Sequence, residues 1–150
     1  MNDLIEKLEQ TKIETLDCFG LTDERLERTY EPNKWNVRYL LHHLADAETV
    51  LFERIRRVIS EPKQVLWAFD QDLWAEKLNY SRVPLILSKN IYSATRDAII
   101  YYAQMHYRNS EQIGFVHSEA GIRTLKDEFD KVAWHNEHHL DQIRKASTVI

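Results

Sequence analysis

The sequence has few residues that break or turn a chain, with three glycines and three prolines among 150 residues. Strands joined by tight turns need many such residues, so their scarcity favours a few long helices. The chain also has a single cysteine, Cys18, which excludes an internal disulfide framework and a cysteine-rich zinc module. We therefore expect the protein to reside in a reducing compartment, the cytoplasm.

Long apolar runs and an excess of positive charge are missing as well. No uncharged apolar run approaches the ~18 residues of a membrane-spanning helix, so we expect no membrane partner. The first seven residues carry a charge in every turn, unlike a signal peptide. Twenty Lys and Arg against 24 Asp and Glu give a net charge of −4, which argues against a non-specific nucleic-acid binder, because such proteins are basic. The composition is that of a globular protein, and we expect one domain over residues 1–150.

Apolar side chains recur at helical spacing in four segments, most clearly at Val37, Leu41, Leu44 and Leu51 in the second of them. Segment 61–83 between the second and third is irregular, contains four aromatic residues and is long for a connection. It predicts a crossover between parallel helices or a lid over a site, with a short helix near 70–78. We predict an all-α four-helix bundle. The predicted helices span about 3–18, 35–59, 84–107 and 124–146.

Histidines are concentrated in the middle of the last predicted helix, in the run His135 to His139. At about 100° per residue, His135 and His139 fall on the core-facing side one turn apart, so their imidazoles can converge. Buried neutral imidazoles need partners, and a metal ion supplies one for both. The alternative is one buried, hydrogen-bonded histidine and one partly exposed histidine. Asn136 stands where a zinc protease of the HExxH type has glutamate, which excludes that class.

A third histidine comes from the second predicted helix. His43 lies beside its apolar stripe, whereas His42 is expected to point to solvent. With His135 and His139 it would complete a three-histidine face, and three histidines with open positions are typical of a catalytic metal site. We expect zinc or nickel, with iron, manganese or cobalt as alternatives, and a small-molecule substrate.

Glu48 projects into the same apolar stripe, where a carboxylate should be paired or protonated. We predict a catalytic role for Glu48, as an acid or base or as support for a metal ligand. The alternative is that it pairs with an arginine or reaches the edge of the bundle. Asp46 and the run Arg54, Arg56 and Arg57 are expected on the surface.

Two further residues lie outside the predicted three-histidine face. His117 belongs to the irregular segment 109–123 and is placed to reach a site at the end of the bundle. Trp134 is expected to project outward, which indicates an interface or a covering loop.

Four motifs spread along nearly the whole chain point to a known family. They are Lys34-Trp35-Asn36-Val37, His43-Leu44-Ala45-Asp46-Ala47-Glu48, His117-Ser118-Glu119-Ala120-Gly121 and His135-Asn136-Glu137-His138-His139-Leu140. With these motifs the chain resembles the DinB/YfiT-like superfamily. The resemblance implies a four-helix bundle of non-alternating topology and a divalent metal held by three histidines, which correspond to His43, His135 and His139. Members are often dimers, so we expect a homodimer.

The resemblance leaves several activities open. Relatives include S-transferases that use bacillithiol, mycothiol-dependent isomerases and metal-dependent hydrolases. We expect the isomerase chemistry least, because those isomerases carry an additional C-terminal domain that this sequence does not match. Our hypothesis is a metal-dependent enzyme that acts on a small electrophilic molecule, either as an S-transferase with a low-molecular-weight thiol or as a hydrolase. The alternative is a non-catalytic, stress-related helical interaction module with a structural or vestigial metal site.

Overall fold

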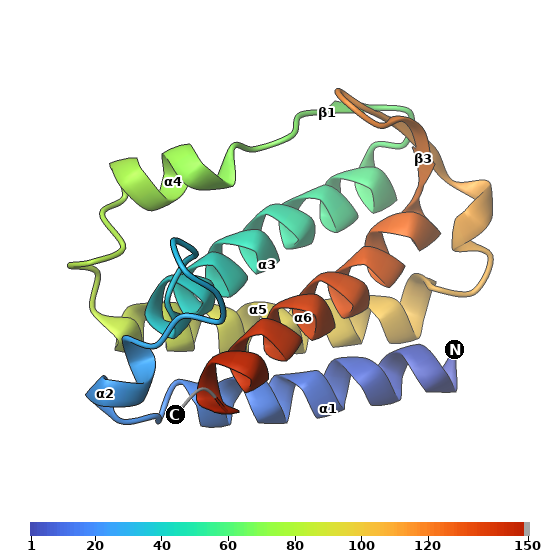
Figure 1. The fold of residues 1–150 in the computed structure, drawn as a ribbon. Coiled ribbons are helices and arrows are strands. Elements are labelled where there is room, and N and C mark those ends of the chain that lie inside the picture. The colour runs from blue at the N-terminus through green and yellow to red at the C-terminus, as the bar shows by residue number, and fades with distance from the viewer. Residues whose placement is uncertain (149–150) are drawn as a thin grey trace.

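Four long helices form a bundle in the computed structural model, which describes residues 1–148 (Figure 1). Their boundaries agree with the predicted ones to within two residues. The long helices are α1 (Asn2–Cys18), α3 (Val37–Ser60), α5 (Leu85–His106) and α6 (Leu125–Thr148). The shorter elements are α2 (Asp23–Leu26), β1 (Val65–Leu66), α4 (Gln71–Lys77), η1 (Ser110–Gln112), β2 (Gly114–His117) and β3 (Gly121–Thr124).

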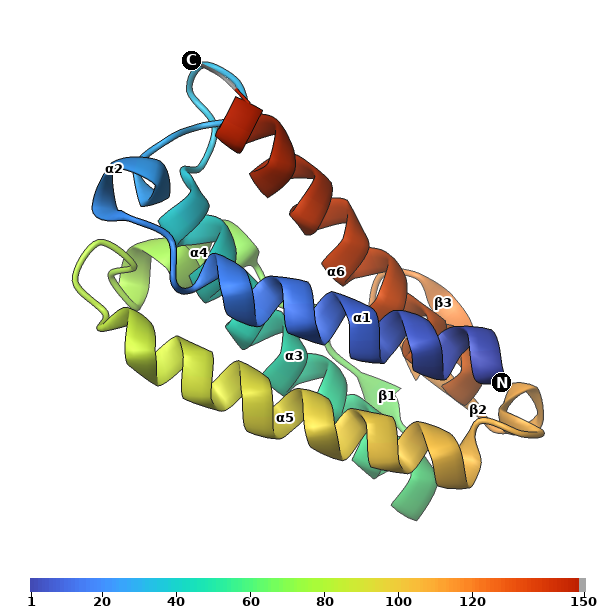
Figure 2. The same cartoon turned by 90° about the horizontal axis from the view of Figure 1, so that it is seen from below.

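The helices do not alternate in direction. α3 and α5 run one way along the bundle, whereas α1 and α6 run the other way (Figures 1 and 2). α3 and α1 each pack against both α5 and α6. Because α3 and α5 are parallel, the chain between them must return along the length of the bundle. The crossover segment, residues 61–84, makes this return and carries α4, at the place where the sequence predicts a crossover and a short helix.

Side-chain caps fix where the two histidine-bearing helices begin. Asn36 caps α3 by accepting a hydrogen bond from the backbone N–H of Tyr39 at 2.9 Å. At the start of α6, Asp127 accepts from the backbone N–H of Thr124 at 2.8 Å, and Thr124 accepts from the N–H of Asp127 at 3.3 Å. This reciprocal arrangement is a capping box with aspartate in place of glutamate.

The core has two apolar clusters with a layer of polar side chains between them. One cluster includes Leu8, Ile55 and Phe129, and the other includes Leu41 and Ile143. At the level between the clusters, each long helix contributes polar residues instead. We call this group the polar layer, and its members are Thr11, Thr15, Glu48, Tyr92, Arg96 and Asn136.

A small sheet covers the end of the bundle where α3 ends and α6 begins (Figures 1 and 2). β1 pairs parallel with β2, and β2 pairs antiparallel with β3. The sequence predicts only an irregular stretch over 109–123, because strands of two to four residues are too short to show an alternating pattern. The turn before β3 needs Gly121, whose φ of +77° is disfavoured for other residues. None of the described helices combines the length and the apolar character that crossing a membrane requires.

Candidate metal site

The structure brings three histidines from two helices to one point. His43 comes from α3, and His135 and His139 come from α6. One ring nitrogen of each lies within 4.8 Å of the other two, and Nε2 of His43 is 3.0 Å from Nε2 of His135. Nitrogen ligands around a tetrahedral zinc ion lie about 3.3 Å apart, given Zn–N bonds of about 2.0 Å. The three imidazoles are therefore close to the arrangement that a metal ion requires.

All three imidazoles favour the neutral form, which is the form that binds metal. Burial, together with nearby His139, lowers the pKa of His43 to about 3. Burial also lowers the pKa of His139 to about 4, and burial with the neighbouring His139 and His43 holds the pKa of His135 well below its ordinary value. Each ring therefore offers a lone pair at neutral pH.

Gln142 determines which nitrogen of His139 faces the site. Nδ1 of His139 lies 2.7 Å from Oε1 of Gln142, an oxygen that can only accept, so Nδ1 carries the proton and donates. Nε2 is left with the lone pair. This is how neighbouring residues orient histidine ligands in metal proteins. The sequence analysis did not predict a role for Gln142. Its position three residues after His139 on the same helix could have indicated this contact.

Aromatic side chains cover His43. The ring of Trp35 lies 5.3 Å from the imidazole of His43, and Phe69 of the crossover segment stacks on it at 6.1 Å. Phe69 in turn packs on Trp74 of α4 at 4.9 Å. The crossover segment therefore acts as a cover over the three histidines as well as a connection, and His43 is almost fully buried.

Two predictions about α3 are wrong. His42 is buried rather than solvent-exposed, and its Nδ1 lies 2.6 Å from Oγ of Ser88. Asp46 is half-buried, because it accepts a hydrogen bond from the hydroxyl of Tyr80 in the crossover segment. Burial raises the pKa of Asp46 despite that hydrogen bond. The periodicity of α3 alone does not show that a segment distant in sequence covers this side.

Arg54 was expected on the surface and is also buried. It donates from Nη2 to the backbone oxygen of Trp67 at 2.6 Å. Its Nη1 lies 3.7 Å from a carboxylate oxygen of Glu128 on α6. The partners of Arg54 thus come from the crossover segment and from another helix, and neither is visible in the local sequence.

An open cavity leads to His135 and His139. It has a volume of about 500 Å³ and is lined by His135, His139, Gln142, Trp35 and Gln71, among others. A larger cavity of about 670 Å³ lies between α1 and α6 and contains none of the three histidines. Of these two cavities, the smaller one is therefore the one that opens onto the histidines.

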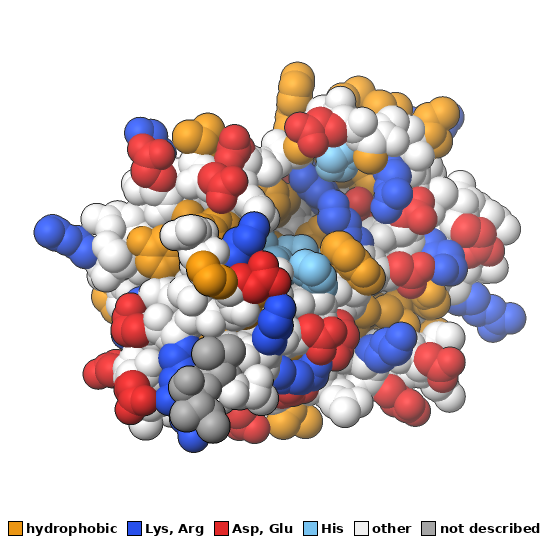
Figure 3. All heavy atoms as spheres, viewed as in Figure 1, with side chains coloured by type: hydrophobic (Ala, Val, Ile, Leu, Met, Phe, Trp, Pro, Cys, Tyr) orange, Lys and Arg blue, Asp and Glu red, His pale blue; other side chains and the backbone are white. Residues whose placement is uncertain are grey.

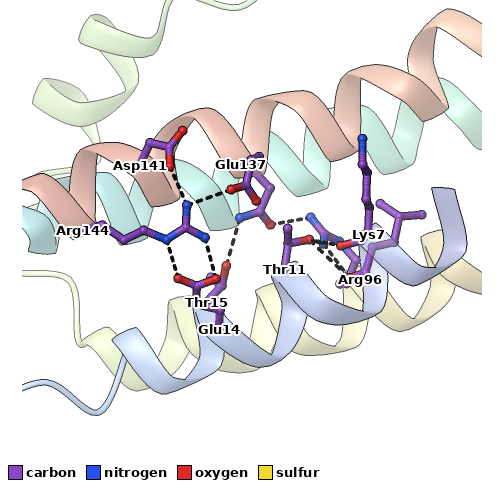
Figure 4. A network of polar contacts seen from close by, with 10 residues as sticks. Lys7, Thr11, Glu14, Thr15, Arg96, Glu137, Asp141 and Arg144 are labelled. Atoms are coloured by element: carbon purple, nitrogen blue, oxygen red, sulfur yellow. Dashed lines mark hydrogen bonds and ion pairs between the residues drawn. The ribbon is translucent and has the colours of Figure 1, made fainter. Parts of the chain in front are cut away.

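Glu48 is not part of the three-histidine group. Its carboxylate accepts hydrogen bonds from Nε of Arg96 at 3.0 Å and from Nη2, and both residues are fully buried. Arg96 also donates to the backbone oxygen of Leu8 and to Oγ1 of Thr11 on α1 (Figure 4). Glu48 is thus paired with an arginine in the polar layer, and its catalytic role stays a prediction.

The polar layer reaches the metal-site helix through Asn136. Oδ1 of Asn136 accepts from Arg96 at 2.6 Å, and Nδ2 donates to Oγ1 of Thr15 at 2.9 Å (Figure 4). Oδ1 also accepts from the hydroxyl of Tyr92 at 2.5 Å. Asn136 is adjacent to His135. The layer therefore fixes α6 against the other three long helices at a point between His135 and His139.

The remaining candidates lie apart from the three-histidine group. His117 is buried on β2, where its Nδ1 accepts from the backbone N–H groups of Glu119 and Ala120 at 3.2 and 3.1 Å. Trp134 projects outward as predicted, with 63% of its surface exposed, and stacks on His138 at 5.2 Å. Trp134 also lines the cavity that leads to the histidines.

Known proteins resemble this chain along most of its length. The family model of the DinB superfamily matches residues 7–143. A protein of Oceanobacillus iheyensis named "Putative metal-dependent hydrolase OB0413" is 31% identical over 130 residues, which are 85% of this chain and 73% of that protein. "Putative metal-dependent hydrolase BH0277" of Halalkalibacterium halodurans is 25% identical, over 85% of this chain and 74% of that protein.

A solved structure shares the fold. It is YfiT from Bacillus subtilis, described as "a probable metal-dependent hydrolase with an unusual four-helix bundle topology". The two structures have a TM-score of 0.83 at 22% sequence identity, covering 97% of this chain and 85% of the other. The predicted fold class, an all-α four-helix bundle with a long crossover, is confirmed. On the family match and the identity to its relatives, the chain belongs to the DinB superfamily.

Proposed function

We propose that the protein is a metal-dependent enzyme that acts on a small molecule, with a divalent ion bound by His43, His135 and His139. One observation carries the proposal: three neutral imidazoles converge beside an open cavity. The names of the relatives, which refer to metal-dependent hydrolysis, agree with it. A divalent ion bound there would lower the pKa of water or of a thiol at an open position and so supply a nucleophile at neutral pH.

The surrounding side chains have separable tasks in this proposal. Gln142 fixes the tautomer of His139. Trp35 and Phe69 exclude water from the covered side of His43. Glu48 acts as a positioning residue, since it holds Arg96, which in turn holds Asn136 beside His135.

A purely structural metal site would be closed by a fourth protein ligand. Among residues 1–148 no fourth His, Cys, Asp or Glu joins the group, which favours an open, catalytic site.

Metal content is the direct test. Native protein purified without an affinity tag is expected to contain about one divalent ion per chain, as a single three-histidine site predicts. His43→Ala and the double variant His135→Ala/His139→Ala should each lose it, measured by plasma mass spectrometry. The matched control is His138→Ala, because His138 lies on the same helix but stacks on Trp134 outside the group. Native protein that holds no metal, even after incubation with zinc or nickel, would overturn the proposal.

The identity of the nucleophile separates hydrolysis from S-transfer. We favour hydrolysis, with thiol S-transfer as the second use of the same site. Metal-loaded protein is incubated with small activated esters or electrophiles, with and without a low-molecular-weight thiol. Mass spectrometry of the products then shows whether water or the thiol was added, and the three-histidine variants should form neither product.

Gln142 provides a test of how the site is oriented. Gln142→Leu removes the acceptor for Nδ1 of His139 and is expected to weaken zinc binding by about 10- to 100-fold, the usual effect of losing such a partner. Gln142→Glu keeps an acceptor and should retain the affinity. Competition against a chromogenic chelator measures both. Equal zinc affinity in Gln142→Leu and native protein would show that the hydrogen bond does not orient the ligand.

A further inference from the structure

A group of basic side chains lies next to the three histidines, toward the sheet. We call Arg54, Arg123 and Lys131 the basic cluster. Lys131 is four residues before His135 on α6, so it lies on the same face of the helix about 6 Å along the axis. Figure 3 shows Lys and Arg side chains and histidines together in the hollow between the sheet and α6.

The hollow joins the basic cluster to the metal site through Trp134. A cavity of about 340 Å³ is lined by Lys131, Arg123 and Trp134, together with two aspartates. Trp134 also lines the cavity of about 500 Å³ that contains His135 and His139. A small molecule that lies against Trp134 can therefore contact both the histidines and Lys131.

Lys131 is the cation of this cluster without an acidic partner. Arg54 lies 3.7 Å from Glu128, and Arg123 lies 3.9 Å from Asp127. Lys131 is half-buried, yet within residues 1–148 its ammonium group makes no ion pair and no hydrogen bond to protein. By contrast, the other two lysines of α6, Lys126 and Lys145, pair with Asp130 and Glu31.

The electrostatics of the cluster agree with an excess of positive charge. Burial lowers the pKa of Lys131, and the nearby Arg54 and Arg123 lower it further, against the opposing effect of Glu128. Burial, Arg54 and Lys131 likewise lower the pKa of His117 on the sheet. Burial also raises the pKa of Glu128, whose carboxylate oxygens are buried without a hydrogen bond, so Glu128 offsets only part of this positive charge. The ammonium group of Lys131, which has no acceptor in the described part of the protein, is therefore available to bind an anion.

We propose that Lys131, supported by Arg54 and Arg123, binds an anionic group of the molecule that occupies the metal site. The substrate, or a thiol that acts with it, then carries a carboxylate or a phosphate at the end that lies toward Lys131. This inference rests on the proposed function and narrows its substrate class to anionic small molecules. Lys131 is a binding residue in this scheme, because it contacts the ligand directly.

The test compares a charged probe with its neutral counterpart on cobalt-loaded protein. The probes are 3-mercaptopropionate and its methyl ester, and binding is followed by the visible and near-ultraviolet absorption of the bound cobalt. The measured quantity is the ratio of the acid's affinity to the ester's affinity. This ratio is expected to be about tenfold higher in native protein than in the Lys131→Met variant. Because the acid-to-ester ratio is compared between variants, the different acidities of the two thiols cancel.

Two control variants and a competition experiment make the result specific. Lys131→Arg should retain the preference for the acid, because it keeps the charge. Lys126→Met removes one positive charge from the same helix at a lysine already paired with Asp130, and should also retain the preference. Competition by inorganic phosphate and by acetate then distinguishes the two sources of negative charge.

The cobalt content of every sample separates this inference from the proposed function. Native protein that takes up no cobalt would overturn the proposed function and this inference with it. Loaded protein with the same acid-to-ester ratio in native and Lys131→Met samples would overturn the anion site alone. A ratio that falls to about one-tenth of the native value in Lys131→Met, with cobalt retained, supports it.

Discussion

Arg96→Met is expected to lower the free energy of unfolding by about 3–5 kcal/mol, the usual cost of removing one partner from a buried ion pair. Arg96 is fully buried and donates hydrogen bonds to Glu48, Thr11, Leu8 and Asn136. Without it, the carboxylate of Glu48 remains in the core with no counter-charge. Urea unfolding at pH 7, followed by far-ultraviolet circular dichroism, measures the loss.

Two variants show whether the loss comes from buried charge. Lys12→Met breaks a surface ion pair with Asp97 that also joins α1 to α5, and should cost less than about 1 kcal/mol. The double variant Glu48→Leu/Arg96→Met leaves no unpaired charge and should recover part of the stability lost in Arg96→Met. If Arg96→Met lowers the free energy of unfolding no more than Lys12→Met does, the buried ion pair of the polar layer does not stabilise the bundle.

The second large effect is a loss of folding stability at acidic pH. Metal-free protein is expected to lose stability steeply as the pH falls below 6.5. Burial lowers the pKa of His42 and His139 to about 4 and that of His43 to about 3. Between pH 6.5 and about 4 these histidines bind protons in the unfolded chain but not in the folded protein. Protons therefore favour unfolding, at about 1.4 kcal/mol per pH unit for each such histidine.

Urea unfolding in the presence of a chelator, at several pH values from 7.5 to 4.5, tests this expectation. His43→Leu removes one of the titrating groups and should reduce the slope of stability against pH by about 1.4 kcal/mol per unit in the same window. His138→Leu alters an exposed histidine on α6 and should leave the slope unchanged. A slope that is the same in native and His43→Leu protein would contradict the assignment.

The four helices and the three histidines could be predicted because the information is local. The spacing of apolar residues sets the phase of α3 and α6, and that phase places His135 and His139 on the inward side of α6 and His43 beside the stripe of α3. The short helix α4 and the crossover follow from the length and the aromatic content of segment 61–83. These features depend on residues close together in sequence.

The features that were missed depend on partners far apart in sequence. The sequence does not single out Arg96, because its acceptors lie on α1, α3 and α6. Arg54 was predicted to lie on the surface because its partners, Glu128 and the backbone of Trp67, lie elsewhere in the chain. His42 is buried by Ser88 of α5 and Tyr80 of the crossover segment, and Asp46 is buried by Tyr80. In each case a tertiary contact, rather than the helix periodicity, determines the burial.

The polar layer and the cavity rim impose different constraints on sequence divergence. Any single substitution at Arg96 removes hydrogen bonds to acceptors on three other helices at once, so change there requires several coordinated replacements. Gln71 and Lys131 line the cavities without a hydrogen-bond partner among the described residues, and each is free to change alone. Descendants of one ancestral bundle can thus acquire new substrates one mutation at a time, while the interior that holds the histidines stays the same.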